Sequence, residues 1–340
     1  RGNVLHQTVY GKGGRQVIRN FYDDSGHLRS RTIQGRGGLT RQTFDGRGNV
    51  TSDTSRSSSS KGTTTTKRTM DKNGKVLTET KVVKTKQGAQ ITTTSNKYDS
   101  KGNKIKSETK TFATNPKTGK IELKSIVETT NKFNTAGRVV QSTSIVTSAD
   151  GSKQKTDATF TYDTKGRLKS ATTVNSAFDA KKTDFVEVGG QTKSYEYLAG
   201  DMVSRVQIDT FGVDSKGTRI TEQSEVHQYK YDAQGNVTKE AVTTSTLDAD
   251  GKLTEKSKQV IDTKFNQLGQ VTSTTINLYS IAAGESKLVA KIQETFKFAK
   301  NGEEIGSTKK LSIADESGQL QYVGRKEVDI VKGEEVSRNF

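Results

Sequence analysis

The residue types that most often carry chemistry are few and scattered in this 340-residue chain. The three histidines, His6, His27 and His227, lie far apart in the sequence, and no two have the short spacing of a zinc site. Cysteine is absent, which excludes disulfides, zinc–thiolate sites and a cysteine nucleophile. No nucleophile, base and orienting group can be assembled from these residues. We therefore predict that the protein is not an enzyme and has no catalytic residue, cofactor or metal ligand.

Two kinds of short motif resemble ligand-binding loops. Residues 248–251, Asp-Ala-Asp-Gly, are followed by Glu255, but a calcium-binding EF-hand needs more oxygen ligands and flanking helices. The glycine-rich residues 11–14 and 35–38 have neither the spacing of a phosphate-binding loop nor a following helix. All three segments are typical of tight hairpin turns, which is what we predict for them.

The charge of the chain favours an anionic partner. Lysine and arginine number 55 against 38 aspartates and glutamates, a net charge of +17. Such an excess attracts anionic polysaccharide, lipopolysaccharide, nucleic acid or a membrane surface. The alternative is that the cations keep exposed strands soluble and prevent edge-to-edge pairing. The aromatic residues lie mainly at turn positions, where packing explains them, so we do not expect a nucleic acid partner. No stretch reaches the roughly 18–20 apolar residues of a membrane helix, so no transmembrane span is predicted.

One turn motif dominates the sequence: an aromatic residue, Asp or Asn, two variable residues, Gly, a polar residue and an aliphatic residue. Asp or Asn can bond to the backbone two residues on, and Gly accepts a positive φ, which predicts a type I turn closed by a G1 bulge. The aromatic residues are predicted to form a ladder that fixes strand register. The clear copies contain Tyr22, Asp23 and Gly26; Phe44, Asp45 and Gly48; Tyr98, Asp99 and Gly102; Phe133, Asn134 and Gly137; Tyr162, Asp163 and Gly166; Tyr231, Asp232 and Gly235; and Phe265, Asn266 and Gly269.

A plainer set of turns lies between these copies. Examples are Lys117-Thr118-Gly119, Asp150-Gly151, Asp250-Gly251 and Ser317-Gly318, and Asp-Gly is itself a favoured hairpin turn. Turns therefore recur about every 16 residues, with and without the aromatic motif in alternation. The repeating unit is a pair of hairpins of about 33 residues.

The segments between turns have the composition of thinly covered strands. Hydrophobic residues make up only 29% of the chain, against roughly 45–50% apolar residues in ordinary globular proteins. Along residues 121–133, alternation places Ile121, Leu123 and Val127 on one face, and Ile126 interrupts the pattern. We predict an all-β fold: a repetitive antiparallel β-hairpin meander forming a thin, spiral or shell-like sheet, with little or no helix.

The chain is divided by composition into four regions. Residues 1–60 are rich in glycine and arginine and are predicted to form short hairpins, and residues 61–174 are predicted to form regular long hairpins. Residues 175–220 lack the clear motif and are either an irregular repeat or an insertion, whereas residues 221–340 again form regular long hairpins. The alternative is a single continuous domain. Residues 55–66 are a serine- and threonine-rich segment that is either a flexible joint or part of a strand.

The motif resembles the YD repeats of the rearrangement-hotspot and teneurin-like proteins. The best matches are the segments at 162–168, Tyr-Asp-Thr-Lys-Gly-Arg-Leu, and at 231–237, Tyr-Asp-Ala-Gln-Gly-Asn-Val. The resemblance extends from about residue 22 to 302 but only at the turns. It implies long β-hairpins wound into a spiral that encloses a toxin or presents an adhesive surface.

Two functions are consistent with these features. The first is a non-catalytic structural repeat protein, a subunit or segment of a surface fibre, filament or β-shell, which associates with itself or with flanking repeats. The second is an adhesin or toxin-shell module that binds anionic glycans through a basic face. Both imply a secreted or cell-surface protein, with a bacterial source expected from the repetitive, cysteine-free sequence. The first residue is Arg1 rather than Met, so we expect a processed product or an internal piece.

Overall fold

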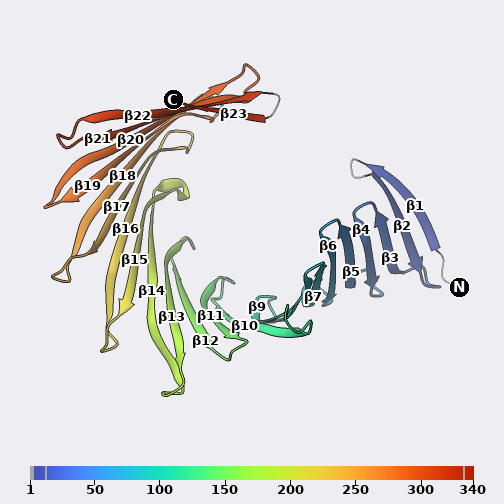
Figure 1. The fold of residues 1–340 in the computed structure, drawn as a ribbon. Helices are drawn as coiled ribbons and strands as arrows, with labels where there is room; N and C mark the ends of the chain where they lie inside the picture. The colour runs from blue at the N-terminus through green and yellow to red at the C-terminus, as the bar shows by residue number, and fades with distance from the viewer. Residues whose placement is uncertain (1–3, 12–13, 332–333) are drawn as a thin grey trace. The chain divides into compact units, whose positions relative to one another are not determined.

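The computed structural model describes residues 4–11, 14–331 and 334–340 (Figure 1). Its 23 strands belong to one antiparallel sheet, and each described pairing joins strands that are consecutive in the sequence. In the described part of the chain the one helical segment is η1, a 3-10 turn over Ala199–Asp201. The predicted all-β hairpin meander is therefore confirmed. The turn predicted at residues 11–14 falls partly outside the described residues.

The chain divides into two compact units, and unit 1 comprises Arg1–Ala158 and Asn175–Val186. From β1 to β11 each strand pairs with the next, and the strands lie side by side in sequence order (Figure 1). The strands are β1 (Val4–Gly11), β2 (Gly14–Tyr22), β3 (Leu28–Gly35), β4 (Gly38–Phe44), β5 (Val50–Ser59), β6 (Gly62–Met70), β7 (Val76–Thr85), β8 (Gly88–Tyr98), β9 (Lys104–Thr114), β10 (Ile121–Phe133) and β11 (Val139–Ser148).

Unit 2 comprises Thr159–Val174 and Glu187–Phe340. Three strands, β12 (Lys153–Tyr162), β13 (Leu168–Asp179) and β14 (Asp184–Tyr197), contribute residues to both units. From β14 onward each strand again pairs with the next. The remaining strands are β15 (Val203–Val213), β16 (Arg219–Tyr231), β17 (Val237–Leu247), β18 (Leu253–Phe265), β19 (Val271–Ala282), β20 (Glu285–Phe298), β21 (Glu304–Ala314), β22 (Leu320–Val331) and β23 (Glu334–Asn339).

Strand pairing continues through the predicted regional boundaries. β5 and β6 pair across residues 60 and 61, and β16 runs through residues 220 and 221. Residues 175–220 hold parts of β13 and β16 with β14 and β15 between them, so this region is an irregular repeat of the same hairpin pattern. The four regions thus differ in composition rather than in secondary structure.

The serine- and threonine-rich residues 55–66 belong to paired strands. β5 and β6 pair from Ser52 opposite Thr69 to Ser59 opposite Gly62, so a two-residue turn joins them. Gly62 has a φ of +146°, and a Cβ there would lie 2.2 Å from the carbonyl oxygen of Lys84. Only glycine fits this position, and the strand alternative for the segment is the right one.

The sheet is thin, as predicted. The hydrophobic side chains that are buried in the described residues are Phe211, Val260 and Ile281, with exposed fractions of 7%, 8% and 8%. Cross-strand hydroxyl pairs contribute instead, such as Thr69 to Thr78 at 2.6 Å and Thr94 to Thr109 at 3.0 Å. Each cross-strand pair stabilises a sheet by roughly 0.2–1 kcal/mol, so stability is spread over many small terms.

One face prediction in β10 is wrong. The register of β10 against β9 shifts between Leu123 and Ser125, which is a β-bulge at Lys124. Because a bulge reverses the alternation of side chains, Leu123 and Ile126 share a face, and Val127 points to the other. The interruption seen at Ile126 in the sequence was the sign of this bulge.

The best-packed cluster of unit 2 surrounds Phe211. Phe211 pairs directly with Gly190 of β14, and a Cβ on Gly190 would lie only 2.6 Å from Cζ of the ring. The guanidinium of Arg219 lies 4.8 Å from the ring centroid, in the range of cation–π contacts. Glu187 holds that guanidinium with two hydrogen bonds, of 2.6 and 2.9 Å. Glycine here makes room for a ring that covers the bare backbone.

Candidate functional site

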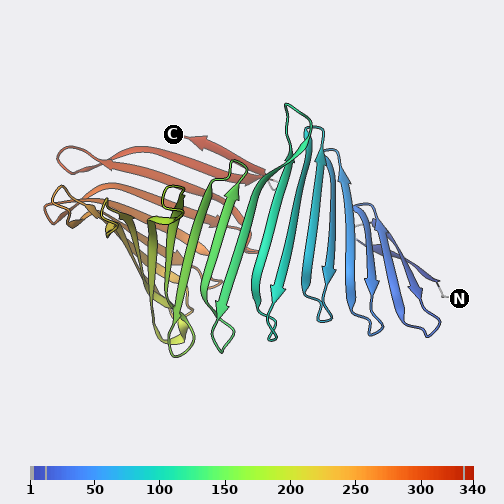
Figure 2. The ribbon, with the colours of Figure 1, turned by 90° about the horizontal axis from the view of Figure 1, so that it is seen from below.

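The seven predicted motif turns share one backbone geometry. In each, the N–H of Gly donates to the carbonyl of the first turn residue, and the N–H of that first residue donates to the carbonyl four residues on. The glycine φ values lie between 75° and 86°. These are type I turns closed by a left-handed glycine, the G1 bulge arrangement. Figure 2 shows successive hairpin turns between β2 and β10 at alternating ends of the strands, so the motif turns of unit 1 all lie at the same end of the strands.

The plainer turns at Asp150-Gly151 and Asp250-Gly251, which were predicted as two-residue Asp-Gly turns, have the same geometry as the motif turns. At Asp250-Gly251 the turn begins at Asp248, whose carbonyl accepts the N–H of Gly251 at 3.1 Å. The same hydrogen bond joins Asp214 to Gly217 and Asp315 to Gly318. Sequence reasoning missed the turn at Asp214 because Val213 stands in the aromatic position. The aromatic residue is not required for this turn, and Asp-x-x-Gly alone does not define it, because Asp209 and Gly212 have the same spacing inside β15.

The aspartate carboxylates are bound to their own turns. Oδ1 of Asp45 accepts the backbone N–H groups of Arg47 and Asn49, at 2.9 and 2.8 Å, and Oδ2 accepts the amide of Asn49 at 3.0 Å. The side-chain and backbone hydrogen bonds from Asn49 lower the pKa of Asp45. Hydrogen bonds from the Ser317 hydroxyl and the Gln321 amide lower the pKa of Asp315 to about 2. These carboxylates stabilise their own turns.

Neighbouring motif turns are joined by tyrosine hydroxyls. The hydroxyl of Tyr98 donates to the carbonyl of Val76 at 3.0 Å, and the hydroxyl of Tyr231 donates to the carbonyl of Val203 at 2.7 Å. Val76 begins β7 directly after the turn at 70–75, and Val203 begins β15 directly after the turn that contains η1. The motif tyrosine therefore fixes its own turn to the turn before it.

Long polar side chains join other turns in the opposite direction. Nζ of Lys75 donates to the carbonyl of Gly102 at 2.5 Å, and Nε2 of Gln270 donates to the carbonyl of Gly302 at 2.6 Å. In unit 2, Arg167 bridges Asp163 of its own turn and Asp201 near the next, at 2.7 and 3.0 Å. The side chain that follows the turn glycine thus reaches forward to the next turn.

The seven predicted ladder aromatics each end the strand that enters a motif turn. Cations contact some of these rings: Arg31 lies 5.7 Å from the Phe44 centroid, and Lys75 lies 5.4 Å from the Tyr98 centroid. That the aromatic residues fix register stays a prediction.

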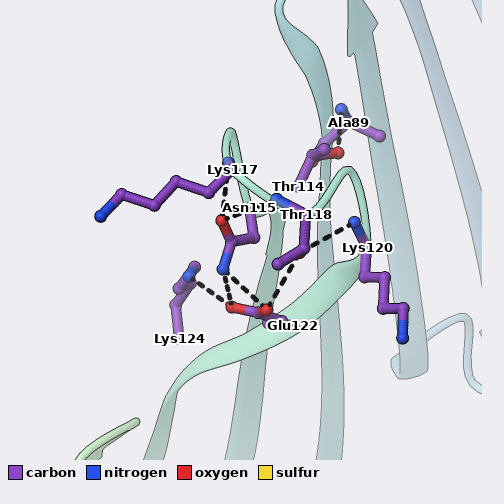
Figure 3. A network of polar contacts seen from close by, with 8 residues as sticks. All are labelled: Ala89, Thr114, Asn115, Lys117, Thr118, Lys120, Glu122 and Lys124. Carbon is purple, nitrogen blue, oxygen red and sulfur yellow. Dashed lines mark hydrogen bonds and ion pairs between the residues drawn. The ribbon is translucent and has the colours of Figure 1, made fainter.

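The predicted turn at residues 117–119 is part of a wider loop that begins at Asn115 (Figure 3). The N–H of Asn115 donates to the carbonyl of Lys120 at 2.8 Å, and Pro116 lies inside the loop. The amide of Asn115 donates to both carboxylate oxygens of Glu122, at 2.8 and 2.9 Å. These bonds, with that of Lys124, lower the pKa of Glu122. The loop is held by polar contacts alone.

The histidines lie in separate surroundings. His6 accepts a hydrogen bond from Arg19 at 3.1 Å, and His27 lies 3.5 Å from Asp23. His227 lies 3.0 Å from Glu240, and its Nε2 is buried without a hydrogen bond. Within the described ranges no three His, Cys, Asp or Glu side chains are grouped to bind a metal ion. No helix of the described residues is long and apolar enough to cross a membrane.

Unit 2 contains a groove large enough for a small ligand. It has a volume of about 1000 Å³ and lies between the motif turns at 231–237 and 265–271, with Asp232, Phe265, Asn266 and Gly269 among its lining residues. A second hollow of about 490 Å³ continues along the strands and shares Lys230 and Lys239 with it. We call the two together the β15–β18 groove. Its volume is in the range of small-ligand sites.

Cations dominate the β15–β18 groove. The lining includes Arg205, Lys230, Lys239, Lys258 and Lys264, against the acids Glu196, Asp232 and Asp262. The side-chain hydrogen bond from Asn236, together with backbone hydrogen bonds of 2.9 Å from Gln234 N and Asn236 N, lowers the pKa of Asp232 and keeps it ionised. The groove still has five cations against three acids. No sequence motif marks these cations, because strand register alone brings residues of four strands together.

Comparisons with known proteins give no family. No protein-family model and no curated protein matches the chain. Solved structures with similarity include a Bacteroides fragilis protein of unknown function, 14% identical, covering 40% of this chain and 89% of its own, with a TM-score of 0.28. Porin-like proteins from Bacteroides vulgatus and Bacteroides uniformis are 11% and 13% identical, cover 78% and 76% of this chain and 100% and 93% of their own, and have TM-scores of 0.23 and 0.20.

Proposed function

We propose that the protein is a non-catalytic, extracellular structural repeat protein, a segment or subunit of a surface fibre, filament or β-shell. The observation that carries the proposal is the set of contacts from turn to turn. Tyr98 and Tyr231 reach back to the preceding turn, and Lys75 and Gln270 reach forward to the next. Such contacts make each repeat depend on its neighbours, which is the behaviour of a repeat array.

Exposed apolar side chains at the outer strands support self-association or pairing with flanking repeats. Leu5 and Tyr10 of β1 are 61% and 76% exposed, and Tyr322 of β22 and Val336 of β23 are 59% and 47% exposed. Among the described strands, β1 pairs only with β2, and β23 pairs only with β22. A strand with an unpaired edge is a template for another strand.

The test is the assembly state of the purified chain, measured by light scattering and electron microscopy. We expect concentration-dependent oligomers or fibres, and we expect Leu5→Lys with Val336→Lys to shift them to monomers, because charge on an edge strand opposes pairing. A matched control is Leu198→Lys, at a leucine that is 44% exposed in a turn. Assembly that is absent at all concentrations, or that the edge and turn variants weaken equally, contradicts the proposal.

A second function, binding of anionic glycans as an adhesin or toxin-shell module, is favoured by the β15–β18 groove. Its cations are held on a rigid sheet between two motif turns, which is a fitting arrangement for an acidic polymer. Charge-driven binding weakens with salt, because the Debye length falls from roughly 30 Å at 0.01 M to about 8 Å at 0.15 M. Binding of an acidic polysaccharide that stays constant over this range contradicts this second function.

A further inference from the structure

Strand register places the cations of the β15–β18 groove on a single face. Lys230 of β16 lies directly opposite Lys239 of β17, and Lys239 lies opposite Asp262 of β18. Arg205 lies opposite Gln228, two residues before Lys230, and Lys258 lies opposite Thr243, four residues after Lys239. Since residues at even spacing along a strand share a face, Arg205, Lys230, Lys239 and Lys258 all point to the same side of the sheet.

The opposed lysines are an unfavourable pair in the free protein. Like charges directly opposite each other on neighbouring antiparallel strands destabilise the pairing. Asp262 relieves part of this repulsion: its Oδ1 lies 3.5 Å from Nζ of Lys239, and the Asp262 and Lys239 side chains are 46% and 42% exposed. An anionic ligand between Lys230 and Lys239 removes this repulsion, so the site gains more from binding than isolated lysines do.

Several groups in the groove are available to a ligand. In the described part of the chain, the ammonium groups of Lys230 and Lys258 have no hydrogen bond or ion pair with another side chain. Nearby, the amides of Gln228, Gln234 and Gln267 are exposed and have no side-chain hydrogen bond among the described residues. Primary amides both donate and accept, which suits sugar hydroxyls, and the ammonium groups suit carboxylate or sulfate.

The positions of the rings distinguish a glycan from a nucleic acid. Tyr229 lies between Gln228 and Lys230 in the strand and opposite Glu240, so its ring points to the other face. Phe265 follows Lys264 at the strand end and also alternates away from the cation face. Single-stranded nucleic acid binding depends on rings that stack on bases. Tyr229 and Phe265 are among the lining residues of the groove, but alternation along the strands directs both rings away from the cation face, which has charge and amides.

We propose that the β15–β18 groove binds an acidic polysaccharide chain, with Arg205, Lys230, Lys239 and Lys258 contacting its anionic groups and the exposed glutamines its hydroxyls. This rests on the second proposed function and assigns it a site. Neighbouring strands lie about 4.8 Å apart, so the four strands present cations over about 14 Å across the sheet. A polymer with repeated carboxylates meets several of these cations at once.

The experiment is titration calorimetry of the full chain with polygalacturonate at low salt. The groove variant is Lys230→Gln, Lys239→Gln and Lys258→Gln, and the matched control is Lys86→Gln, Lys117→Gln and Lys120→Gln, exposed lysines in hairpin turns of unit 1. Exposed ion pairs contribute about 0.2–1 kcal/mol each, so losing three lowers affinity by about tenfold. We expect that loss in the groove variant and less than a twofold change in the control.

A second variant, Gln228→Glu with Gln234→Glu, adds negative charge without removing a lysine and is expected to weaken binding as strongly. Thermal melts confirm that each variant is folded. Equal loss in the groove and control variants overturns the site but leaves glycan binding standing, whereas no binding by the unmodified chain overturns both. Neutral dextran binding as tightly as polygalacturonate, or oligothymidylate binding more tightly, overturns the assignment to an acidic polysaccharide.

Discussion

The contact between Gly190 and Phe211 allows a sharp test of how this thin sheet is packed. In Gly190→Ala the new Cβ would lie 2.1 Å from the carbonyl oxygen of Thr173 and 2.6 Å from Cζ of Phe211. Neither neighbour can swing aside, because one is backbone and the other is a ring only 7% exposed. Overpacking of this kind costs about 1–3 kcal/mol, and the two rigid neighbours place the expected cost at about 2–3 kcal/mol.

The matched control for this change is Gly212→Ala, in the strand that carries Phe211. Its Cβ would meet Oε1 of Glu222 at 2.2 Å, but that carboxylate is the far end of a flexible side chain. A side chain that rotates away leaves the free energy of unfolding within about 0.5 kcal/mol of the unmodified protein.

The assay is unfolding followed by circular dichroism, with temperature and with urea. For a unit of this size each kcal/mol lowers Tm by about 2–4 °C, so we expect Gly190→Ala to lose about 5–10 °C. The urea midpoint should fall with an unchanged slope. If Gly190→Ala and Gly212→Ala have the same Tm, the contact between Gly190 and the Phe211 ring does not constrain the sheet, and the prediction is refuted.

Two further predictions concern the turns. Tyr231→Phe removes the hydrogen bond to the carbonyl of Val203 and should lower the free energy of unfolding in urea by about 0.5–1.5 kcal/mol. The control Tyr10→Phe, at a side chain that is 76% exposed, should not change it measurably. Equal effects of the two changes would mean that turn-to-turn hydrogen bonds do not contribute to stability. The pKa of Asp315 in the folded protein is about 2, below its ordinary value of 3.8. Its contribution to folding stability is therefore complete above pH 3.8 and is lost as the pH falls toward 2. The pKa is also lowered for Asp23, Asp45, Asp99 and Asp232, so Tm should fall steeply between pH 4 and 2. This fall should persist in 0.5 M salt, which screens the general repulsion between positive charges. If salt fully restores Tm at pH 2, the turn carboxylates are not the cause.

The fold was predictable from the sequence because its information is local. Asp45, Gly48 and their equivalents define turns through hydrogen bonds within five residues, and sequential turns leave only antiparallel neighbours to pair. The type of turn followed from Asp or Asn and Gly three residues later at the end of a strand, and the error at Asp250-Gly251 came from reading two residues where four make the turn.

What depends on register was not predictable. The bulge at Lys124 reversed the faces in β10, and a single added residue in a strand is enough to do this. The β15–β18 groove exists because register places Lys230 opposite Lys239, and no local pattern marks that pairing. The Phe211 cluster likewise joins residues from three strands, β14, β15 and β16, which no local pattern brings together.

The consecutive pairing of strands has a mechanical consequence. Since β21, β22 and β23 pair, among the described residues, with their neighbours in the chain, tension applied from β23 opens one ladder at a time from the margin instead of shearing many at once. A strand and its turn, about 16 residues, release roughly 50 Å of chain at 3.3–3.6 Å per residue. Under such tension the protein extends in a series of small, similar and reversible unfolding steps, each of which dissipates part of the applied load.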